Sequence, residues 1–206
     1  MLKTLAEPDA RTGGRPGQRM RSRLLDAAAA KFKARGFAAA SMAEIAAEAG
    51  AFPSQVTYYF GTKEALFVEA ACREMLYLAR DAELASAAND VGGTYLEIMV
   101  RSVIAAPRLN LFVEALALAH RRPDLQPQVQ RTFERLDVES GRALEEHHAR
   151  RGWAPTRSPV PAHRFWALAI GMAARGGATG ESPEALAADM LSMLSDGPRE
   201  PAGGSR

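Results

Sequence analysis

The chain has 206 residues, of which 47% are hydrophobic and 24% charged, so it can bury a core and is not a disordered protein. No apolar run reaches the roughly 20 residues of a membrane span, no secretory signal is recognisable, and a single cysteine excludes an internal disulfide. We therefore expect a protein of the reducing cytoplasm without a membrane partner.

The net charge of +2 is unevenly distributed along the chain. Residues 1–63 hold ten basic and five acidic groups, whereas the remaining residues hold 16 basic and 19 acidic groups. A basic first third on an acidic body is typical of a nucleic-acid-binding segment joined to a second domain.

The first third of the sequence predicts an N-terminal arm and three helices. Residues 1–17 are rich in Gly, Pro and Arg and lack an apolar period, so we expect a flexible basic arm. After the arm, apolar residues recur every three or four positions up to Gly36, which indicates a helix with one buried face. The S-x-x-E pattern that begins at Ser41 is a capping box and marks the start of the second helix. The three predicted helices span residues 18–35, 42–49 and 53–60.

Beyond Gly61 the periodicity remains helical, and no strand pattern occurs. A long fourth helix follows Thr62, whose hydroxyl suits an N-cap. Further helices are predicted at about 94–105, 108–121, 125–151, 162–175 and 183–195, and residues 197–206 are expected to form a disordered tail. The chain is therefore predicted to be all-α, with an N-terminal three-helix domain over residues 18–61 and a C-terminal helical domain over residues 62–196.

The second and third predicted helices are separated by a short segment, residues 50–52, which is the arrangement of a helix-turn-helix. In such a motif the second helix lies in the major groove of DNA. Val56 and Phe60 lie four residues apart and are expected to pack inward, which leaves the polar positions facing outward. Gln55 is the best candidate for reading a base, because its amide can donate and accept at an adenine edge. The other candidates are Ser54 and Thr57 for base edges, with Tyr58, Tyr59 and Lys63 for phosphate oxygens.

Residues 23–67 resemble the DNA-binding domain of the tetracycline-repressor (TetR) family of bacterial transcriptional regulators. The motifs that carry the resemblance are Leu25-Asp-Ala-Ala28, Phe32, Gly36-Phe37, Ser41-Met-Ala-Glu-Ile-Ala-Ala-Glu-Ala-Gly50, Tyr58-Tyr59-Phe60 and Thr62-Lys-Glu-Ala-Leu-Phe67. Two positions depart from the family pattern: Phe52 stands where a capping serine or threonine is frequent, and Thr57 stands where tyrosine is frequent.

The resemblance implies a homodimer whose two N-terminal domains bind a pseudo-palindromic operator in double-stranded DNA. It also implies a pocket for a small-molecule effector in each C-terminal domain, dimerisation through the last two long helices, and repression of transcription until the effector binds. The DNA contacts would then fall on Ser41, Ser54, Gln55, Thr57, Tyr58, Tyr59 and Lys63.

The helix predicted at 162–175 is apolar on almost every side, so in a monomer it would leave an exposed apolar patch. We expect a second copy of the chain to cover this patch, which supports a dimer independently of the resemblance. The predicted interface residues are Trp166, Ile170, Gly171, Met172, Leu186, Met190 and Leu194.

An apolar effector pocket could be lined by aromatic and methionine side chains, although we expect most of them to belong to the core. These residues are Met75, Tyr95, Met99, Phe112, Phe133 and Trp166. Glu114 lies in an apolar helix, where an acid is costly unless it is paired or solvated. It is therefore a further pocket candidate, with an ion pair to Arg101 or Arg108, or an exposed position, as the alternatives.

The sequence gives no indication of a cofactor or a catalytic site. His147 and His148 are adjacent, so on a helix they point about 100° apart and suit a solvated face better than a shared metal ion. No nucleophile elbow, phosphate-binding loop or zinc-protease motif is present, so we do not expect an enzyme. The alternatives to a repressor are an activator, or a helical dimeric ligand-binding or interaction protein without specific operator binding.

Overall fold

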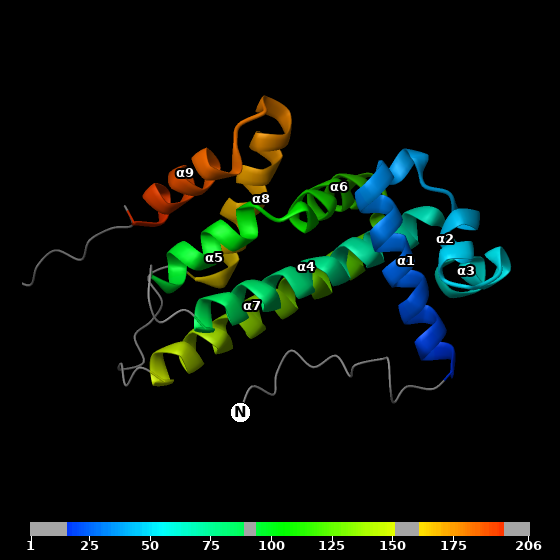
Figure 1. Cartoon of the computed structure of the whole chain (residues 1–206), viewed down its shortest axis with the longest axis horizontal. Helices are drawn as coiled ribbons and strands as arrows, with labels where there is room; N and C mark the ends of the chain where they lie inside the picture. Colours follow the sequence, from blue (N-terminus) through cyan, green and yellow to red (C-terminus); the bar gives the residue numbers. More distant parts are fainter. Residues whose placement is uncertain (1–15, 89–93, 151–160, 196–206) are drawn as a thin grey trace, which may run out of the picture. The chain divides into compact units, whose positions relative to one another are not determined.

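The computed structural model describes residues 16–88, 94–150 and 161–195; the predictions for residues 1–15 and 197–206 lie outside this part of the chain. Within the described residues every regular element is helical, which confirms the predicted all-α class (Figure 1). The elements are α1 (Pro16–Ala39), α2 (Met42–Glu48), α3 (Pro53–Phe60), α4 (Lys63–Ala88), α5 (Tyr95–Ile104), α6 (Pro107–Arg121), the 3-10 helix η1 (Pro123–Leu125), α7 (Gln126–Arg150), α8 (Ala162–Thr179) and α9 (Pro183–Ser195). No single helix in these ranges is long and apolar enough to cross a membrane, whereas the bent pair α5 and α6 meets that test only when taken together.

The described residues form two compact units. Unit 1 lies within Met1–Arg80 and Pro107–Arg135, and unit 2 lies within Asp81–Ala106 and Leu136–Arg206, so α4 and α7 contribute to both. The predicted N-terminal domain falls inside unit 1, where α1 packs against α2 and α6, and α2 packs against α3.

Helix α1 is longer than the sequence predicts at both ends. It begins at Pro16, which suits a first turn because that position needs no N–H donor, so two residues assigned to the arm are helical. At the other end the helix breaks at Gly36, as predicted, with φ 73° and ψ 170°. A helical conformation then resumes as far as Ala39, and glycine is the residue that adopts this positive φ without strain.

Hydrogen bonds at both ends fix α2 in unit 1. The backbone N–H of Glu44 donates to Oγ of Ser41 at 3.1 Å, and the Glu44 carboxylate accepts the Ser41 N–H at 3.0 Å, which confirms the predicted capping box. At the C-terminal end the Arg23 guanidinium donates to the carbonyl of Ala49. A cation there is favourable because it lies at the negative end of the helix dipole.

An aromatic cluster forms the centre of unit 1. The ring of Phe32 meets the ring of Phe67 edge-on, with centroids 4.9 Å apart, and Phe37 lies at 4.9 Å from Phe67. Edge-to-face contacts at this distance add to the stability that burial itself provides, which is about 1.5–3 kcal/mol for each large apolar side chain. Further buried side chains of this core are Leu24, Ile45, Val56 and Leu66.

Two buried charges of α4 join the helices of unit 1. Oε2 of Glu74 accepts from Nζ of Lys33 in α1 at 2.7 Å and lies 3.2 Å from Nε of Arg108 in α6. The neighbouring Arg73 is paired with Asp26 of α1 at 2.7 Å. Each buried charge therefore has an opposite charge within hydrogen-bond distance, which is the condition under which burial is tolerated.

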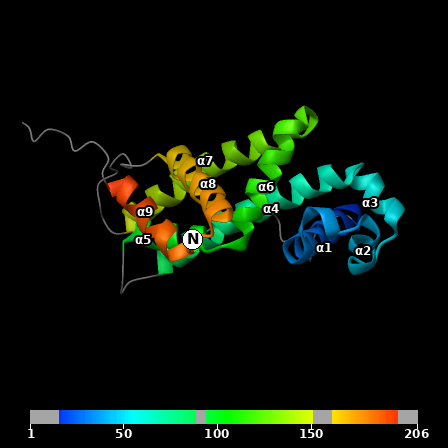
Figure 2. The same ribbon diagram turned by 90° about the horizontal axis from the view of Figure 1, so that it is seen from above.

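Unit 2 is built around α5, which packs against both α8 and α9 (Figures 1 and 2). Helix α8 continues to Thr179, so the prediction that it ends at residue 175 is wrong. Gly176 stays helical and lies so close to the Leu186 side chain that a Cβ atom there would overlap it. This glycine marks a close approach of α8 and α9, while Gly180, with φ 74°, ends the helix.

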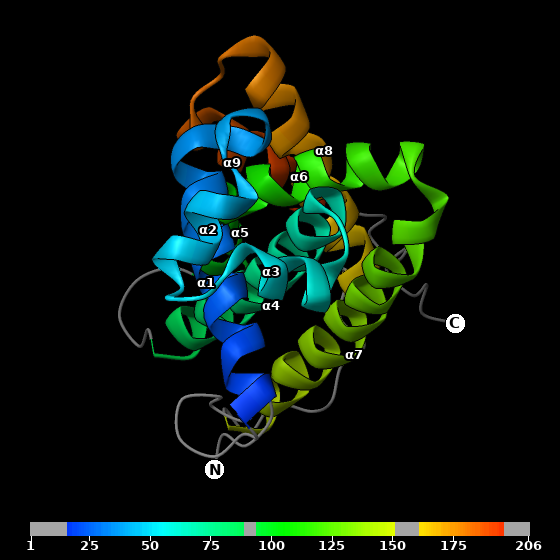
Figure 3. The same cartoon turned by 90° about the vertical axis from the view of Figure 1, so that its right-hand side faces the viewer.

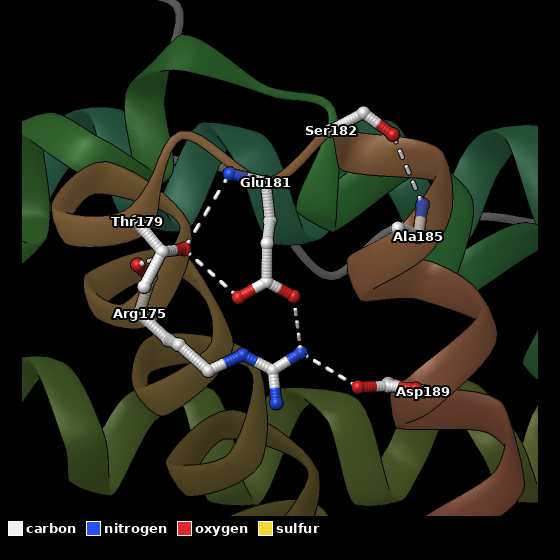
Figure 4. Close-up of polar contacts among 6 residues, drawn as sticks. All are labelled: Arg175, Thr179, Glu181, Ser182, Ala185 and Asp189. Atoms are coloured by element: carbon white, nitrogen blue, oxygen red, sulfur yellow. Dashed lines mark hydrogen bonds and ion pairs between the residues drawn. The ribbon is translucent and has the colours of Figure 1, made fainter.

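Arg175 connects the end of α8 to the start of α9 (Figure 4). Its Nη2 donates to Oε2 of Glu181 at 2.9 Å and to Oδ2 of Asp189 at 2.6 Å. The hydroxyl of Thr179 is 2.8 Å from the other carboxylate oxygen of Glu181. These bonds hold the turn between the two helices in one arrangement.

The prediction of an exposed apolar patch on the single chain is wrong for most of its residues. Trp166, Met172, Leu186 and Met190 are buried within unit 2, where α5, α8 and α9 pack against one another. The remaining members of the set keep accessible surface: Ile170 and Leu194 are half-buried and Gly171 is exposed.

Candidate DNA-binding interface and effector site

Helices α2 and α3 lie side by side in unit 1 and form the helix-turn-helix (Figure 3). Ile45 of α2 and Val56 of α3 are both fully buried, and the two helices pack against each other. Gly50 adopts φ 60° in the turn. Val56 and Phe60 are both buried, as predicted, so the opposite side of α3 faces away from the core.

The N-terminus of α3 is capped in an unusual way. Phe52 occupies the N-cap position, is 75% exposed and offers no side-chain acceptor. Its backbone N–H donates instead to Oε1 of Gln55 at 3.0 Å. Gln55, the residue predicted to contact a base, therefore also caps its own helix. Its amide oxygen serves the cap, and its amide NH₂ group could donate a hydrogen bond to a base. Sequence reasoning missed this cap, although a glutamine three residues after the N-cap is a known signal for it.

The outer side of α3 presents most of the predicted contact residues. Ser54, Thr57 and Tyr58 are exposed, and Tyr58 is 82% exposed. Tyr59 is half-buried, and its ring meets that of Tyr58 edge-on with centroids 5.1 Å apart. The hydroxyl of Thr57 donates to the carbonyl of Pro53 at 3.4 Å. Together with Gln55, one short helix thus brings together five of the seven predicted DNA contacts.

Two predicted contacts outside α3 already have partners within the protein. The Ser41 hydroxyl belongs to the α2 capping box and also donates to Glu44 at 2.9 Å. Nζ of Lys63 donates to the carbonyl of Ala38 at 3.2 Å and lies 4.6 Å from the centre of the Phe37 ring. A phosphate oxygen would be a stronger partner for Lys63 than a neutral carbonyl, because the bond would join opposite charges.

The basic residues of α1 contribute less free charge than their number indicates. Arg35 contacts Glu44 at 2.5 Å and Lys31 contacts Glu48 at 3.1 Å, and both acids belong to α2. Hydrogen bonds from Ser41 and then from Arg35, whose charge adds to the effect, hold the pKa of Glu44 below its usual value, so this acid remains ionised. The positive charge that α1 can offer to DNA is therefore smaller than its number of basic residues indicates, because Arg35 and Lys31 are paired with acids of α2.

The predicted effector-pocket residues divide between the two units. In unit 1, Met75 and Phe112 are buried, and Phe133 meets Phe112 at 5.7 Å between ring centroids. Glu114 is exposed, and Arg108, one of its predicted partners, contacts Glu74 instead. In unit 2, Met99 and Trp166 are buried and Tyr95 is half-buried.

Unit 2 holds a polar cluster that sequence reasoning missed. Glu83 of α4 is 8% exposed, its Oε1 has no hydrogen-bond partner, and Ser140 of α7 hydrogen-bonds the carboxyl group. The Ser140 hydroxyl also accepts the indole N–H of Trp166 at 3.2 Å. The ring of Tyr95 in α5 meets the buried ring of His147 at a tilt of 42°, with centroids 4.6 Å apart. In sequence, Glu83 looks like a surface residue, and only the three-dimensional arrangement shows that it is buried.

Electrostatics around Glu83 favour its neutral form. Burial raises the pKa of this carboxyl group to about 7, the hydrogen bond from Ser140 opposes the rise, and the charges of Glu139 and Glu146 add to it. Burial also raises the pKa of Tyr95, and the charge of Glu83 raises it further.

The cysteine and histidine residues form no recognisable reactive centre in the described part of the chain. Cys72 is buried, its Sγ lies 3.9 Å from the carbonyl of Gln128, and burial raises the pKa of its thiol to about 11. The rings of His147 and His148 are 6.1 Å apart between centroids. Among the described residues, no three His, Cys, Asp or Glu side chains are grouped so that they could hold a metal ion.

Comparison with known proteins relates both parts of the chain to transcriptional regulators. Residues 24–70 match bacterial regulatory proteins of the TetR family, and residues 93–195 match the C-terminal domain of bacterial transcriptional repressors. A protein from Rhodococcus sp. RHA1, described as a transcriptional regulator, is 34% identical, with a TM-score of 0.73 over 85% of this chain and 95% of that chain. No curated relative matches the sequence.

Two more distant structures share the fold. A TetR-family regulator from Mesorhizobium loti MAFF303099 is 22% identical, with a TM-score of 0.61 over 88% of this chain and 96% of that chain. The multidrug binding protein EbrR, solved with imidazole, is 23% identical, with a TM-score of 0.57 over 90% of this chain and 93% of that chain.

The helical fold and the exposed second helix of the helix-turn-helix define a DNA-binding transcriptional regulator. The chain belongs to the TetR family of bacterial regulatory proteins, as the resemblance in residues 23–67 implied. Its N-terminal helices are the DNA-binding part, and residues 93–195 correspond to the family's C-terminal, ligand-binding domain. Regulators of this family do not, in general, catalyse reactions.

Proposed function

We propose that this regulator is a repressor that binds a pseudo-palindromic operator as a homodimer and is released by a small-molecule inducer. The observation that carries the proposal is the outer side of α3, which exposes Ser54, Thr57 and Tyr58 on the second helix of a helix-turn-helix. An exposed aromatic ring beside small hydroxyl side chains suits a DNA surface, where apolar and hydrogen-bonding edges alternate.

The proposed contacts fall into two classes. Gln55 reads a base through its amide, with Ser54 and Thr57 close to the neighbouring base edges. The contacts that fix the position on the backbone are Ser41, Tyr58, Tyr59 and Lys63. Loss of a base contact weakens binding to the operator alone, whereas loss of a phosphate contact weakens binding to every duplex.

The proposed dimer uses the surface of α8 and α9 that unit 2 leaves accessible. Gly171 is exposed and Ile170 and Leu194 are half-buried, so these three residues are the best remaining members of the predicted interface. Gly171 has no atom within 4 Å of the position where a Cβ would lie, which leaves room for the close approach of another helix. The two recognition helices must then meet major-groove faces about 34–36 Å apart.

The proposed release mechanism depends on the short connection between α3 and α4. Only Gly61 and Thr62 separate these helices, so a small displacement of the start of α4 is passed to the recognition helix. An inducer that binds a mis-spaced arrangement more tightly would lower DNA affinity by the same factor by which DNA lowers inducer affinity. An inducer that binds equally well with and without operator would contradict this mechanism.

The proposal is tested by selecting duplexes from a random pool at about 150 mM salt, where purely electrostatic binding is weak. We expect an inverted repeat to be enriched. Gln55→Ala should then cost about 1–3 kcal/mol on the selected duplex only, and Lys63→Ala should weaken all duplexes and reduce the salt slope by about one. Gln130→Ala and Arg164→Ala, both at exposed positions outside the helix-turn-helix, are the controls for side-chain type and charge.

Failure of the selection would have a definite meaning. If folded and dimeric protein enriches no sequence, the operator-binding proposal is wrong. The chain would then be better interpreted as a ligand-binding or interaction protein. Equal effects of Gln55→Ala and Lys63→Ala on specific and random duplexes would contradict the two roles given above.

A further inference from the structure

The carboxyl group of Glu83 is buried in unit 2 with one of its oxygens unpartnered. It is 8% exposed, and its Oε1 makes no hydrogen bond. A buried carboxylate normally has a cation or several N–H donors, because an unpartnered charged oxygen is expensive in a low dielectric. Glu83 has only the hydroxyl of Ser140, and among the described residues no basic side chain forms an ion pair with it.

The charges around Glu83 are predominantly negative. Glu139 and Glu146 of α7 both act on it, and Arg142, which could offset them, is paired with Glu146 at 3.3 Å. The charge of Arg150 acts on Tyr95 rather than on Glu83. Among the described residues, the two charges that act on Glu83 are both negative, so they favour a positive group at its carboxylate.

Aromatic rings lie beside the same carboxyl group. The charge of Glu83 acts on Tyr95, and the ring of Tyr95 meets that of His147 at a tilt of 42°, with centroids 4.6 Å apart. Trp166 reaches the cluster through its hydrogen bond to Ser140, which also binds Glu83. The faces of such rings attract cations and pack well against flat apolar bodies.

We infer that unit 2 carries a binding site for an aromatic organic cation, whose positive group is held by Glu83 and whose ring packs beside Tyr95 and His147. This inference deepens the effector part of the proposed function and rests on it only in assigning the site to an effector. An amidinium group is a suitable donor, since it offers two N–H groups to one carboxylate. When the carboxyl group is protonated, its proton passes to solvent as the cation binds, so the net exchange is one cation for one proton.

The inference is tested with benzamidinium and with benzamide, which has nearly the same shape but no charge. Calorimetric titration of the full-length protein at pH 8 is expected to give at least a tenfold preference for benzamidinium, the minimum expected of one charge-assisted bond. Glu83→Gln should remove the preference, and Glu83→Asp, which keeps the charge, should retain part of it. Glu145→Gln, an exposed acid of α7, should bind like the wild type.

The pH dependence provides an independent readout. Affinity for benzamidinium should rise between pH 6 and pH 8 in the wild type and stay constant in Glu83→Gln, while benzamide should show no trend in either protein. Circular dichroism checks that each variant is folded. Lack of benzamidinium binding by the wild type, equal affinity for the two probes, or an unchanged preference in Glu83→Gln would overturn the inference.

The outcome is separable from that of the operator proposal. Duplex selection uses the wild-type protein without either probe, and the titration uses no DNA. A cation preference without duplex enrichment would retain this site and overturn operator binding, and the reverse result would overturn this site alone.

Discussion

Two buried glutamates of α4, one in each unit, have opposite surroundings. Glu74 in unit 1 is 6% exposed, and its carboxylate contacts Lys33 at 2.7 Å and Arg108 at 3.2 Å. Glu83 in unit 2 is 8% exposed and has one hydrogen-bonding hydroxyl, one unpartnered oxygen and acidic neighbours. Two carboxyl groups of nearly equal burial therefore differ in role. The first, Glu74, joins helices of unit 1 through ion pairs, whereas ionisation of the second, Glu83, is disfavoured because no described cation pairs with it.

The largest loss of stability is expected when the apolar core of unit 1 is disrupted. The losses expected from the charged residues can be compared with it. Phe32→Ala removes a ring that is 1% exposed and contacts Phe67 edge-on, so unfolding in urea should show a loss of about 3–5 kcal/mol. Val138→Ala, at a 70% exposed position, should change stability by less than about 0.5 kcal/mol. A loss below about 1 kcal/mol for Phe32→Ala would show that unit 1 is not held by this cluster.

Removal of the paired glutamate should have the next largest effect. Glu74→Ala leaves Lys33 and Arg108 without their carboxylate, but both side chains are about one-third exposed and can be hydrated. We therefore expect a loss of about 1–3 kcal/mol in urea unfolding, below the range for fully buried pairs. Glu145→Ala is the control at an exposed position. If Glu74→Ala were as stable as the wild type, the ion pairs of Glu74 would not stabilise unit 1, and Glu74 and Glu83 would not differ in this respect.

Glu83→Gln should stabilise the protein at alkaline pH, the opposite sign to Glu74→Ala. The pKa of Glu83 rises from 4.5 to about 7 in the folded state, so the folded protein retains a proton that the unfolded chain has lost. Wild-type stability therefore falls as pH rises from about 4.5 to 7 and is constant above that range, as far as this group is concerned. The difference between the two proteins should grow to about 1–2 kcal/mol at pH 8 and vanish near pH 4.5. A difference independent of pH would contradict the assignment.

The smallest predicted effect concerns packing in unit 2. Gly177→Ala places a methyl group where no atom lies within 4 Å and should stabilise α8 by up to about 1 kcal/mol. Gly176→Ala makes the same helical gain but forces the buried Leu186 side chain to move, so it should be about 1 kcal/mol less stable than Gly177→Ala. Thermal unfolding of the pair decides this, and equal melting temperatures would show that α8 and α9 do not approach closely at Gly176.

Local signals in the sequence predicted the helices of the N-terminal DNA-binding part well. The capping box at Ser41 and the helix boundaries at Gly36 and Gly61 each depend on residues within a few positions, so a single sequence contains the necessary information. The outward positions of α3 follow from the burial of Val56 and Phe60 in the same way.

The structure of unit 2 was less predictable from the sequence, because the contacts that determine it join residues far apart in the sequence. Gly176 looks like a helix stop, but its packing against Leu186 keeps it helical. Glu83 follows a helical pattern that suits a surface residue, yet it is buried while its neighbour Leu84 is 40% exposed. Trp166 seemed to need a second copy of the chain to cover it, whereas its own unit buries it completely.

The chemistry of Cys72 makes the protein a convenient subject for site-specific labelling. The thiol is 1% exposed, and its pKa of about 11 leaves it almost wholly protonated at pH 7, so maleimide reagents should react with it slowly. Because the chain has no other cysteine, a cysteine introduced at the exposed position of Val138 or Gly177 would be the preferred site of modification without any change to the native residue. A spin label or fluorophore placed there in each copy of a dimer would report the separation of the two copies directly, with and without DNA.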